Sequence, residues 1–236
     1  MTNVVKLINV DHAGLRVVAA GWGDGVNQVP VFPTEFEAVQ RDFPIVFHRG
    51  TDGAFEARAL MGLDRGENLF LDGERWRARY VPALLARGPF TIGLEARAGS
   101  APEPMIYVDL DDPRVMSEGG EPVFLPHGGN APCLERVLDA LQTAHLGHAA
   151  QGPMFAAFAA AGLIEPVRIE AQLDDTLRYD IADFHTIGVE ALASLTGSAL
   201  EELHRQGWLA AAVHVVSSLG NMARLIALKN ARRAGA

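Results

Sequence analysis

Acidic residues concentrate at Asp109, Asp111 and Asp112, directly after the apolar run 105–108. On a strand, alternate side chains share a face, so Asp109 and Asp111 should point the same way. Two carboxylates on one face can bind a hard cation or act as a proton donor and acceptor. The simpler interpretation, which we favour, is a solvated strand end at which Asp112 begins a turn.

A second candidate is His127, which precedes Gly128-Gly129-Asn130 in an unusual local string. Two glycines allow close backbone approach and uncommon φ angles, so His127 could be a ligand or proton carrier assisted by Asn130. The structural alternative makes the glycines a tight connection and Asn130 the N-cap of a helix that begins near Pro132. We prefer the capping role for Asn130 and leave the role of His127 open.

The remaining chemistry-bearing residues predict no metal site. None of the eight histidines is followed two residues later by Asp or Glu, a common form of the facial iron-binding triad. His145 and His148 lie three apart on a predicted helix but lack an acidic third ligand nearby. Cys133 is the single cysteine, so it makes neither an internal disulfide nor a cysteine-based zinc site, and we expect it to be buried.

Composition excludes several classes of protein. The chain has 236 residues and a formal net charge of −9, and 49% of its residues are hydrophobic. That balance is typical of a folded protein, and the acidic charge disfavours nucleic acid as a partner. The glycine run 21–25 leads into an extended, proline-containing stretch rather than a helix, so we predict no nucleotide site there. The sequence identifies no cofactor.

The elements that must position these residues indicate an α+β fold. The N-terminal half reads as strands with short helices, one of which should begin at a capping box formed by Thr34 and Glu37. The C-terminal half reads as helices, with breaks at Gly147 and Gly152 and with one β-hairpin that turns at Asp174-Asp175. We expect one domain over residues 1–236, with a subdivision, if there is one, near residues 113–126.

The termini carry predictions about location and assembly. Near the N-terminus Lys6 interrupts the apolar stretch, unlike a secretory signal, so we expect a cytoplasmic protein unless an unconventional route exports it. Residues 208–228 contain too many polar groups for a lipid-facing span and suit an amphipathic helix packed on a core. Gly220 would permit close contact between two copies, so a homo-oligomer is a further expectation.

A set of motifs in order along the chain resembles the bacterial SapC family. The matching segments include Trp76 and the run Arg79-Tyr80-Val81-Pro82, and we take Trp76, Arg79 and Tyr80, with Asn130, as candidate binding residues. The other segments are 29–37, 67–73, Gly88-Pro89-Phe90, 108–113, His127-Gly128-Gly129-Asn130, 218–221 and Lys229-Asn230. The resemblance spans nearly the whole chain, which favours one unit over two unrelated domains.

The resemblance implies a link with surface layers, and members are often encoded near outer-membrane receptors and flavin-dependent halogenases. It implies no catalytic residues. Our first hypothesis is a non-catalytic, protein-binding accessory of a surface-layer, envelope or nutrient-uptake system. The alternatives are a cytoplasmic enzyme that uses His127 with Asp109 and Asp111, with or without a divalent metal, and an exported surface-layer subunit.

Overall fold

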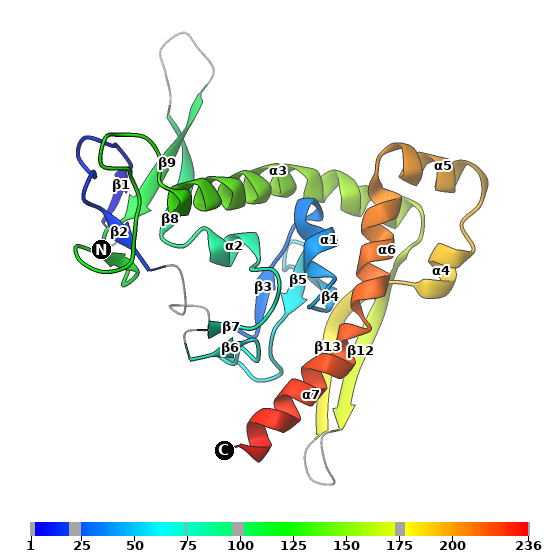
Figure 1. The fold of residues 1–236 in the computed structure, drawn as a ribbon. Helices are drawn as coiled ribbons and strands as arrows, with labels where there is room; N and C mark the ends of the chain where they lie inside the picture. The colour runs from blue at the N-terminus through cyan, green and yellow to red at the C-terminus, as the bar shows by residue number, and fades with distance from the viewer. Residues whose placement is uncertain (1–2, 19–24, 74, 96–101, 173–177, 236) are drawn as a thin grey trace.

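A computed structural model describes residues 3–18, 25–73, 75–95, 102–172 and 178–235. Its buried apolar side chains form two clusters, which we call the large core and the small core. The large core includes Phe36, Phe43, Phe47, Phe158 and Leu225, and the small core includes Val17, Phe90, Val108, Val123 and Leu134. The long helix α3 (Pro132–Ala160) runs from one core to the other, as Figure 1 shows.

An antiparallel sheet of five strands forms the large core, in the order β12-β13-β4-β5-β3. The strands are β3 (Gln28–Pro30), β4 (Ile45–Arg49), β5 (Phe55–Leu60), β12 (Ile164–Gln172) and β13 (Arg178–Ile187). Ile45, Val46 and Phe47 of β4 have no exposed surface, so both faces of this central strand are covered. The ring of Phe155 on α3 stands edge-on to that of Phe47, with 4.9 Å between their centroids.

Short helices and a small ribbon complete the large core. They are the 3-10 turn η1 (Pro33–Glu35), α1 (Phe36–Val39), α2 (Ala83–Ala86), and the paired strands β6 (Leu71–Asp72) and β7 (Arg75–Trp76). The C-terminal helices are α4 (Val189–Ala193), α5 (Gly197–Arg205), α6 (Trp208–Ser218) and α7 (Asn221–Ala234). Helix α6 packs against α1, β4 and β13.

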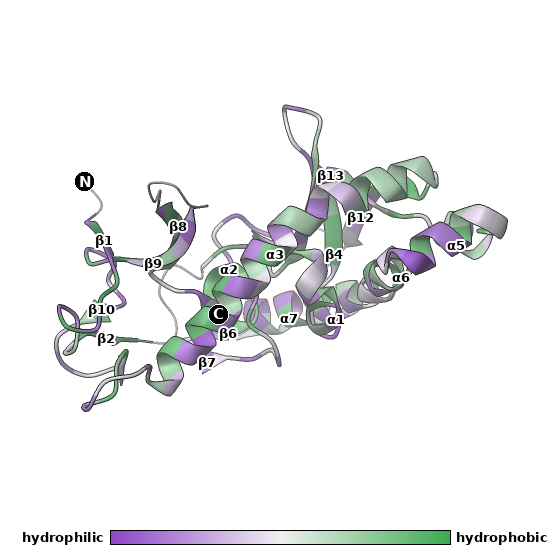
Figure 2. Ribbon diagram, turned by 90° about the horizontal axis from the view of Figure 1, so that it is seen from above, coloured by the Kyte–Doolittle hydropathy of each residue, from purple (hydrophilic) through white to green (hydrophobic). Residues whose placement is uncertain are grey.

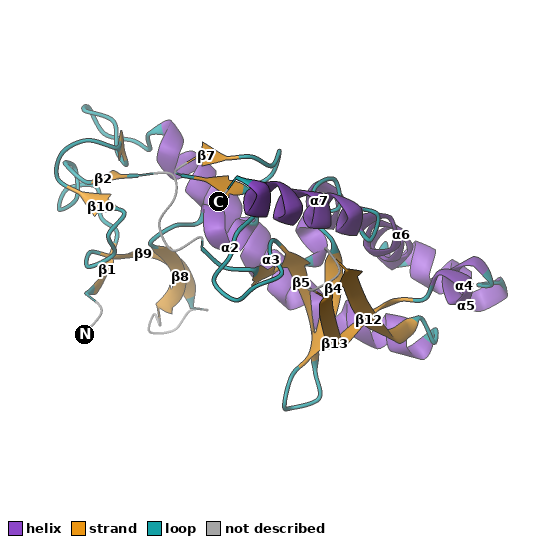
Figure 3. Ribbon diagram, turned by 90° about the horizontal axis from the view of Figure 1, so that it is seen from below, coloured by secondary structure: helices purple, strands orange, loops and turns teal. Residues whose placement is uncertain are grey.

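The small core lies at the other end of the molecule from α4 and α5, as Figure 3 shows. One of its sheets has the order β1-β9-β8, with β1 (Val4–Lys6), β8 (Phe90–Glu95) and β9 (Glu103–Asp109). The other has the order β10-β2-β11, with β2 (Arg16–Val17), β10 (Val115–Met116) and β11 (Glu121–Pro122). The first half of α3 packs on this core through Cys133, Leu134, Val137 and Leu141.

The predicted α+β class is confirmed, with sheets mainly in the N-terminal half and helices toward the C-terminus. The predicted hairpin is β12–β13, and its turn at Asp174-Asp175 lies outside the described residues, as does most of the glycine run 21–25. The single-domain organisation stays a prediction. Strands β10 and β11 lie within residues 113–126, where the sequence allowed a subdivision.

The prediction of a break at Gly147 and Gly152 is wrong, because α3 continues through both positions. Gly147 is buried where α3 crosses the segment that leads into η1. A β-carbon there would lie 3.0 Å from Phe32 Cγ, and closer still to Phe32 Cβ and Thr34 Oγ1. The glycine therefore permits a close crossing instead of ending the helix. Figure 2 shows α3 as a helix along which hydrophobic and hydrophilic residues alternate.

The two predicted helix caps are also wrong. Thr34 Oγ1 donates to the backbone oxygen of Thr143 on α3 at 2.8 Å, and the carboxylate of Glu35, rather than Glu37, accepts the backbone N–H of Phe32 at 3.1 Å. Asn130 pairs with Phe124 as an isolated bridge, and Ala131 is the residue that precedes α3. At Thr34 a tertiary contact uses the hydroxyl that the local pattern had assigned to a cap, whereas before α3 the cap position is occupied by Ala131 instead of Asn130.

Residues 208–234 form the one helical stretch in the described chain that is long and apolar enough to cross a membrane. This is weak evidence for a span, since helices packed on a soluble core have the same composition. The predicted helix over 208–228 is two helices, α6 and α7, which join at Leu219 and Gly220. Ala211, Ala212, Val215 and Leu225 are buried, so the predicted packing on a core is confirmed.

We predict that Gly147→Ala destabilises the protein by about 1–3 kcal/mol, the usual cost of overpacking, because the added methyl meets Phe32 and Thr34. Gly152→Ala is the matched control on the same helix, since its added methyl meets no atom within 4 Å. That control should raise the free energy of unfolding by about 0.5–1 kcal/mol through helix propensity. Chemical denaturation measures both, and equal effects of the two substitutions would contradict the close crossing.

Candidate functional site

The candidate site surrounds the turn Arg87-Gly88-Pro89-Phe90, which joins α2 to β8. Gly88 N donates to Leu85 O at 3.1 Å, and Pro89 O accepts from Asp109 N at 3.0 Å. Gly88 has a φ of +57°, in the left-handed region that glycine adopts without a β-carbon clash. The turn therefore leads the chain from the large core into the small core, and three cavities lined by described residues border it.

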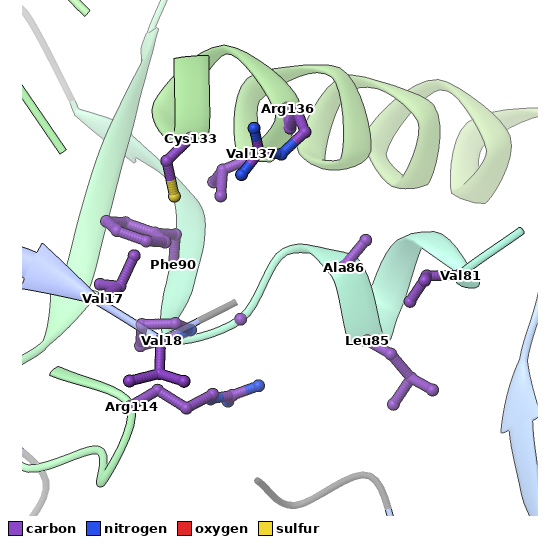
Figure 4. A pocket seen from close by; sticks show the side chains of 12 residues that line it. Val17, Val18, Val81, Leu85, Ala86, Phe90, Arg114, Cys133, Arg136 and Val137 are labelled. Carbon is purple, nitrogen blue, oxygen red and sulfur yellow. The ribbon is translucent and has the colours of Figure 1, made fainter. Parts of the chain in front are cut away.

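The first, which we call the Arg114 cavity, has a volume of about 240 Å³. Its walls are mainly apolar and come from α2, β8, α3 and the end of β2: Val17, Val81, Leu85, Phe90, Cys133 and Val137. Figure 4 shows the α3 side chains Cys133, Arg136 and Val137 above the cavity, with Arg114 opposite them. The arginines supply its charged groups.

Both arginines are held by carboxylates. Arg114 donates to Asp112 through Nε at 3.0 Å and through Nη2 at 2.8 Å, and these hydrogen bonds hold the pKa of Asp112 below its usual range. Arg136 Nη2 lies 2.7 Å from both carboxylate oxygens of Glu121. Such pairs fix the direction in which a guanidinium presents its remaining donors.

Cys133 is buried, as predicted, and faces the Arg114 cavity. Burial raises the pKa of its thiol, Glu121 raises it further, and Arg136 opposes the shift. The thiol is therefore protonated at neutral pH and behaves as a small apolar group.

The second, the Arg87 cavity, has a volume of about 330 Å³ and lies between α2, β8 and α3. Arg87, Thr91, His145 and His148 are its polar lining residues. The third, the Asp109 cavity, measures about 210 Å³ and is lined by Asp109 and Asp112 together with Arg87 and Arg114. Arg87 thus borders two of the three cavities.

The structure places the three predicted catalytic candidates in different surroundings. Asp109 lines the Asp109 cavity, and its Oδ1 accepts the backbone N–H of Asp111 at 3.1 Å. Asp111 is exposed, and His127 is exposed in a turn closed by Gly128 N donating to Leu125 O at 3.0 Å. His127 and Asp111 are not among the residues that line the Asp109 cavity. Their joint catalytic role stays a prediction.

The predicted binding residues are largely engaged within the molecule. Trp76 Nε1 donates to Tyr80 O at 2.9 Å, and Tyr80 Oη donates to the buried carboxylate of Glu35 at 2.9 Å. Arg79 leaves its side chain 75% exposed, although its backbone N–H donates to Asp42 at 2.8 Å. Asn130 lines a further recess next to β9. Of this set, the Arg79 side chain is the one best placed to meet a partner.

Two buried carboxylates, Glu35 and Asp42, were missed by the reasoning from sequence. Glu35 accepts hydrogen bonds from Phe32 N, Tyr80 Oη and Ala83 N, and burial outweighs these bonds and raises its pKa. Asp42 has no exposed surface and also binds Arg224 of α7. Neither residue stands in a local pattern that predicts burial, because all of these partners except Phe32 lie 37 to 182 positions away in the sequence.

The other motif residues fasten α6 and α7 to the N-terminal half. Lys229 is buried and bound by Asp64 and by Glu67, whose Oε1 lies 2.7 Å from its Nζ. Ser218 Oγ accepts the backbone N–H of Ile45 at 2.8 Å, and Asn221 Nδ2 donates to Gln40 O at 2.8 Å. These residues stabilise the fold, and none of Lys229, Ser218 and Asn221 lines the three cavities.

Among the described residues, no group of three or more His, Cys, Asp or Glu side chains is placed to hold a metal ion. His145 and His148, which the sequence placed on one helix face, both line the Arg87 cavity. The Phe32 ring stands edge-on to His148, with 6.2 Å between the ring centroids.

Comparison with known protein families identifies the family of this chain. The family model for SapC matches residues 7–225, so the chain belongs to the SapC family, as the resemblance predicted. No curated protein and no solved structure matches the chain.

We predict that Asp112→Asn destabilises the protein by about 1–2 kcal/mol at neutral pH, because Arg114 loses a charged hydrogen-bond partner. The folded-state pKa of Asp112 is lowered, so its contribution is present above about pH 4 and is lost as the pH falls through that lowered value. Wild type and variant should therefore converge in acid. Denaturation across pH measures this, with the exposed neighbour Asp111→Asn as the control. A pH-independent difference would contradict the ion pair.

Proposed function

We propose that this SapC-family chain is a non-catalytic binding protein that acts as an accessory to a surface-layer, envelope or nutrient-uptake system. The observation that supports binding is the Arg114 cavity, an apolar recess at the junction of the two cores with arginines as its charged groups. Mainly apolar walls with a few placed polar groups are the usual form of a small-ligand site. A protein partner would then receive or sense the loaded chain.

Two features of that cavity favour binding over turnover. Arg114 and Arg136 are held by Asp112 and Glu121, which suits them to orient a ligand more than to exchange protons with it. Cys133 faces the same space with a pKa raised by burial, so its thiol is a poor nucleophile.

The alternative is an enzyme that uses His127 with Asp109 and Asp111, with or without a divalent metal. The lining of one cavity by both Asp109 and Asp112 favours it, since neighbouring carboxylates can bind a cation or move a proton. The exposed turn that carries His127 supports our first proposal instead.

We propose that the protein acts in the cytoplasm, and we expect it in the cytosolic fraction when cells of its source are lysed and separated by centrifugation. The apolar residues of α6 and α7 are partly committed to the large core, which supports this location over a lipid-facing one. Recovery mainly with the envelope would contradict the proposal. Recovery in a surface-layer extract would favour the exported-subunit alternative.

The Arg114 cavity can be closed from its exposed rim. Ala86 is exposed and lines the cavity, so Ala86→Trp should cover the mouth without overpacking a core. We expect a small molecule to be extracted from purified wild-type protein, and several-fold less of it from this variant. Mass spectrometry of the denatured extracts measures both, and Ala159→Trp, at an exposed position of α3, is the matched control.

Equal recovery from the Ala86→Trp variant, or no bound molecule in the wild type, would contradict binding in the Arg114 cavity. Conversion of the extracted molecule on incubation with fresh protein would contradict a non-catalytic role and favour the enzyme alternative.

A further inference from the structure

Arg87 differs from the other two arginines around the candidate site. Arg114 and Arg136 are each paired with a carboxylate, whereas the described residues place no carboxylate within ion-pair distance of Arg87. Within the described part of the chain, its guanidinium makes one hydrogen bond, from Nη1 to Phe90 O at 2.7 Å. A guanidinium has five N–H donors, so most of those of Arg87 remain available.

The surroundings of Arg87 oppose its positive charge. Burial lowers the pKa of Arg87, the nearby charge of Arg114 lowers it further, and Asp112 opposes the shift from a distance. Arginine nevertheless stays protonated in proteins, so Arg87 carries a partly buried positive charge that is incompletely compensated, at a cost in folding free energy. An anion bound beside Arg87 would remove that cost.

The Arg87 cavity has the walls for a ligand with an apolar body. Phe32, Leu84, Ile92, Leu141 and Ala144 line it, together with the hydroxyl of Thr91 and the imidazoles of His145 and His148. All the polar groups among these can donate a hydrogen bond to an anion. The volume of about 330 Å³ is within the usual range for small-molecule pockets.

The fork of a guanidinium matches the two oxygens of a carboxylate, and such pairs are among the stronger charged hydrogen bonds. We propose that the Arg87 cavity binds a small carboxylic acid whose apolar body packs between α2, β8 and α3 while its carboxylate meets Arg87. The site is separate from the Arg114 cavity, since the two have no lining residue in common. The inference therefore does not depend on the proposed function.

The test uses 3-phenylpropionate as the probe and the neutral 3-phenylpropionamide as its uncharged match. Isothermal titration calorimetry of the full chain should show that the acid binds and that the amide binds at least about tenfold more weakly. Arg87→Gln should weaken binding of the acid by about tenfold and leave the amide unchanged, and Arg87→Lys should fall between wild type and Arg87→Gln.

Two further variants test the position of the site. Ala144→Trp places a large side chain in the cavity and should abolish binding of both probes. Arg136→Gln removes a positive charge from the same helix but from the Arg114 cavity, so binding of the acid should be unchanged. Circular dichroism and thermal unfolding confirm that each variant is folded before its titration is interpreted.

The proposal is overturned if folded Arg87→Gln and Ala144→Trp bind the acid as the wild type does, or if the amide binds as tightly as the acid. Absence of binding to the wild type overturns it as well. Inorganic phosphate that binds as tightly as 3-phenylpropionate would show a general anion site and would overturn the assignment to apolar carboxylic acids. None of these outcomes bears on ligand recovery from the Ala86→Trp variant, so the two proposals fail separately.

Discussion

Helix α3 can lie against Phe32 and Thr34 only because position 147 has no β-carbon. The crossing fixes the helix on the large core, and Thr34 secures it with a hydrogen bond to Thr143 O. Because α3 is continuous, its first half is then carried into the small core, where Cys133 and Val137 line the Arg114 cavity. Its middle turns supply His145 and His148 to the Arg87 cavity. The position of α3 in the walls of both cavities therefore depends on the crossing at Gly147.

Buried polar groups hold the other walls in place. Glu35 joins η1 to Tyr80 and, through Ala83 N, to the start of α2. These hydrogen bonds position α2, which Arg87 directly follows. Asp42 and Lys229 tie α7 to the N-terminal half by ion pairs in which each of these two residues is itself buried. Breaking a buried pair leaves a charge without compensation, which makes such contacts specific as well as stabilising. Many residues of the family motifs therefore stabilise the fold, and the cavities lie between the segments that these residues hold in place.

The chain has a negative net charge, but the side chains around its cavities include several positively charged arginines. The formal charge of −9 disfavours nucleic acid, yet arginines line all three cavities beside the 87–90 turn. Most of that positive charge is compensated by Asp112 and Glu121, and Arg87 is the exception within the described chain. Ion pairs surround an apolar space, and this combination suits recognition of a small amphipathic molecule.

The sequence by itself determined the features that depend on residues close together in the chain. Apolar runs predicted strands in the N-terminal half, the polar interruption at Asp174-Asp175 predicted the hairpin β12–β13, and ordered motifs predicted the family. Tertiary structure decided the rest: Gly147 stays in a helix because Phe32 packs on it, and Thr34 bonds to α3 instead of capping a helix. Asp109 faces a cavity while His127 stays in solvent, and Arg87 and Glu35 acquire their roles from residues distant in sequence. Periodicity and capping depend on neighbours within a few positions, whereas burial of a charge depends on which distant segments pack around it.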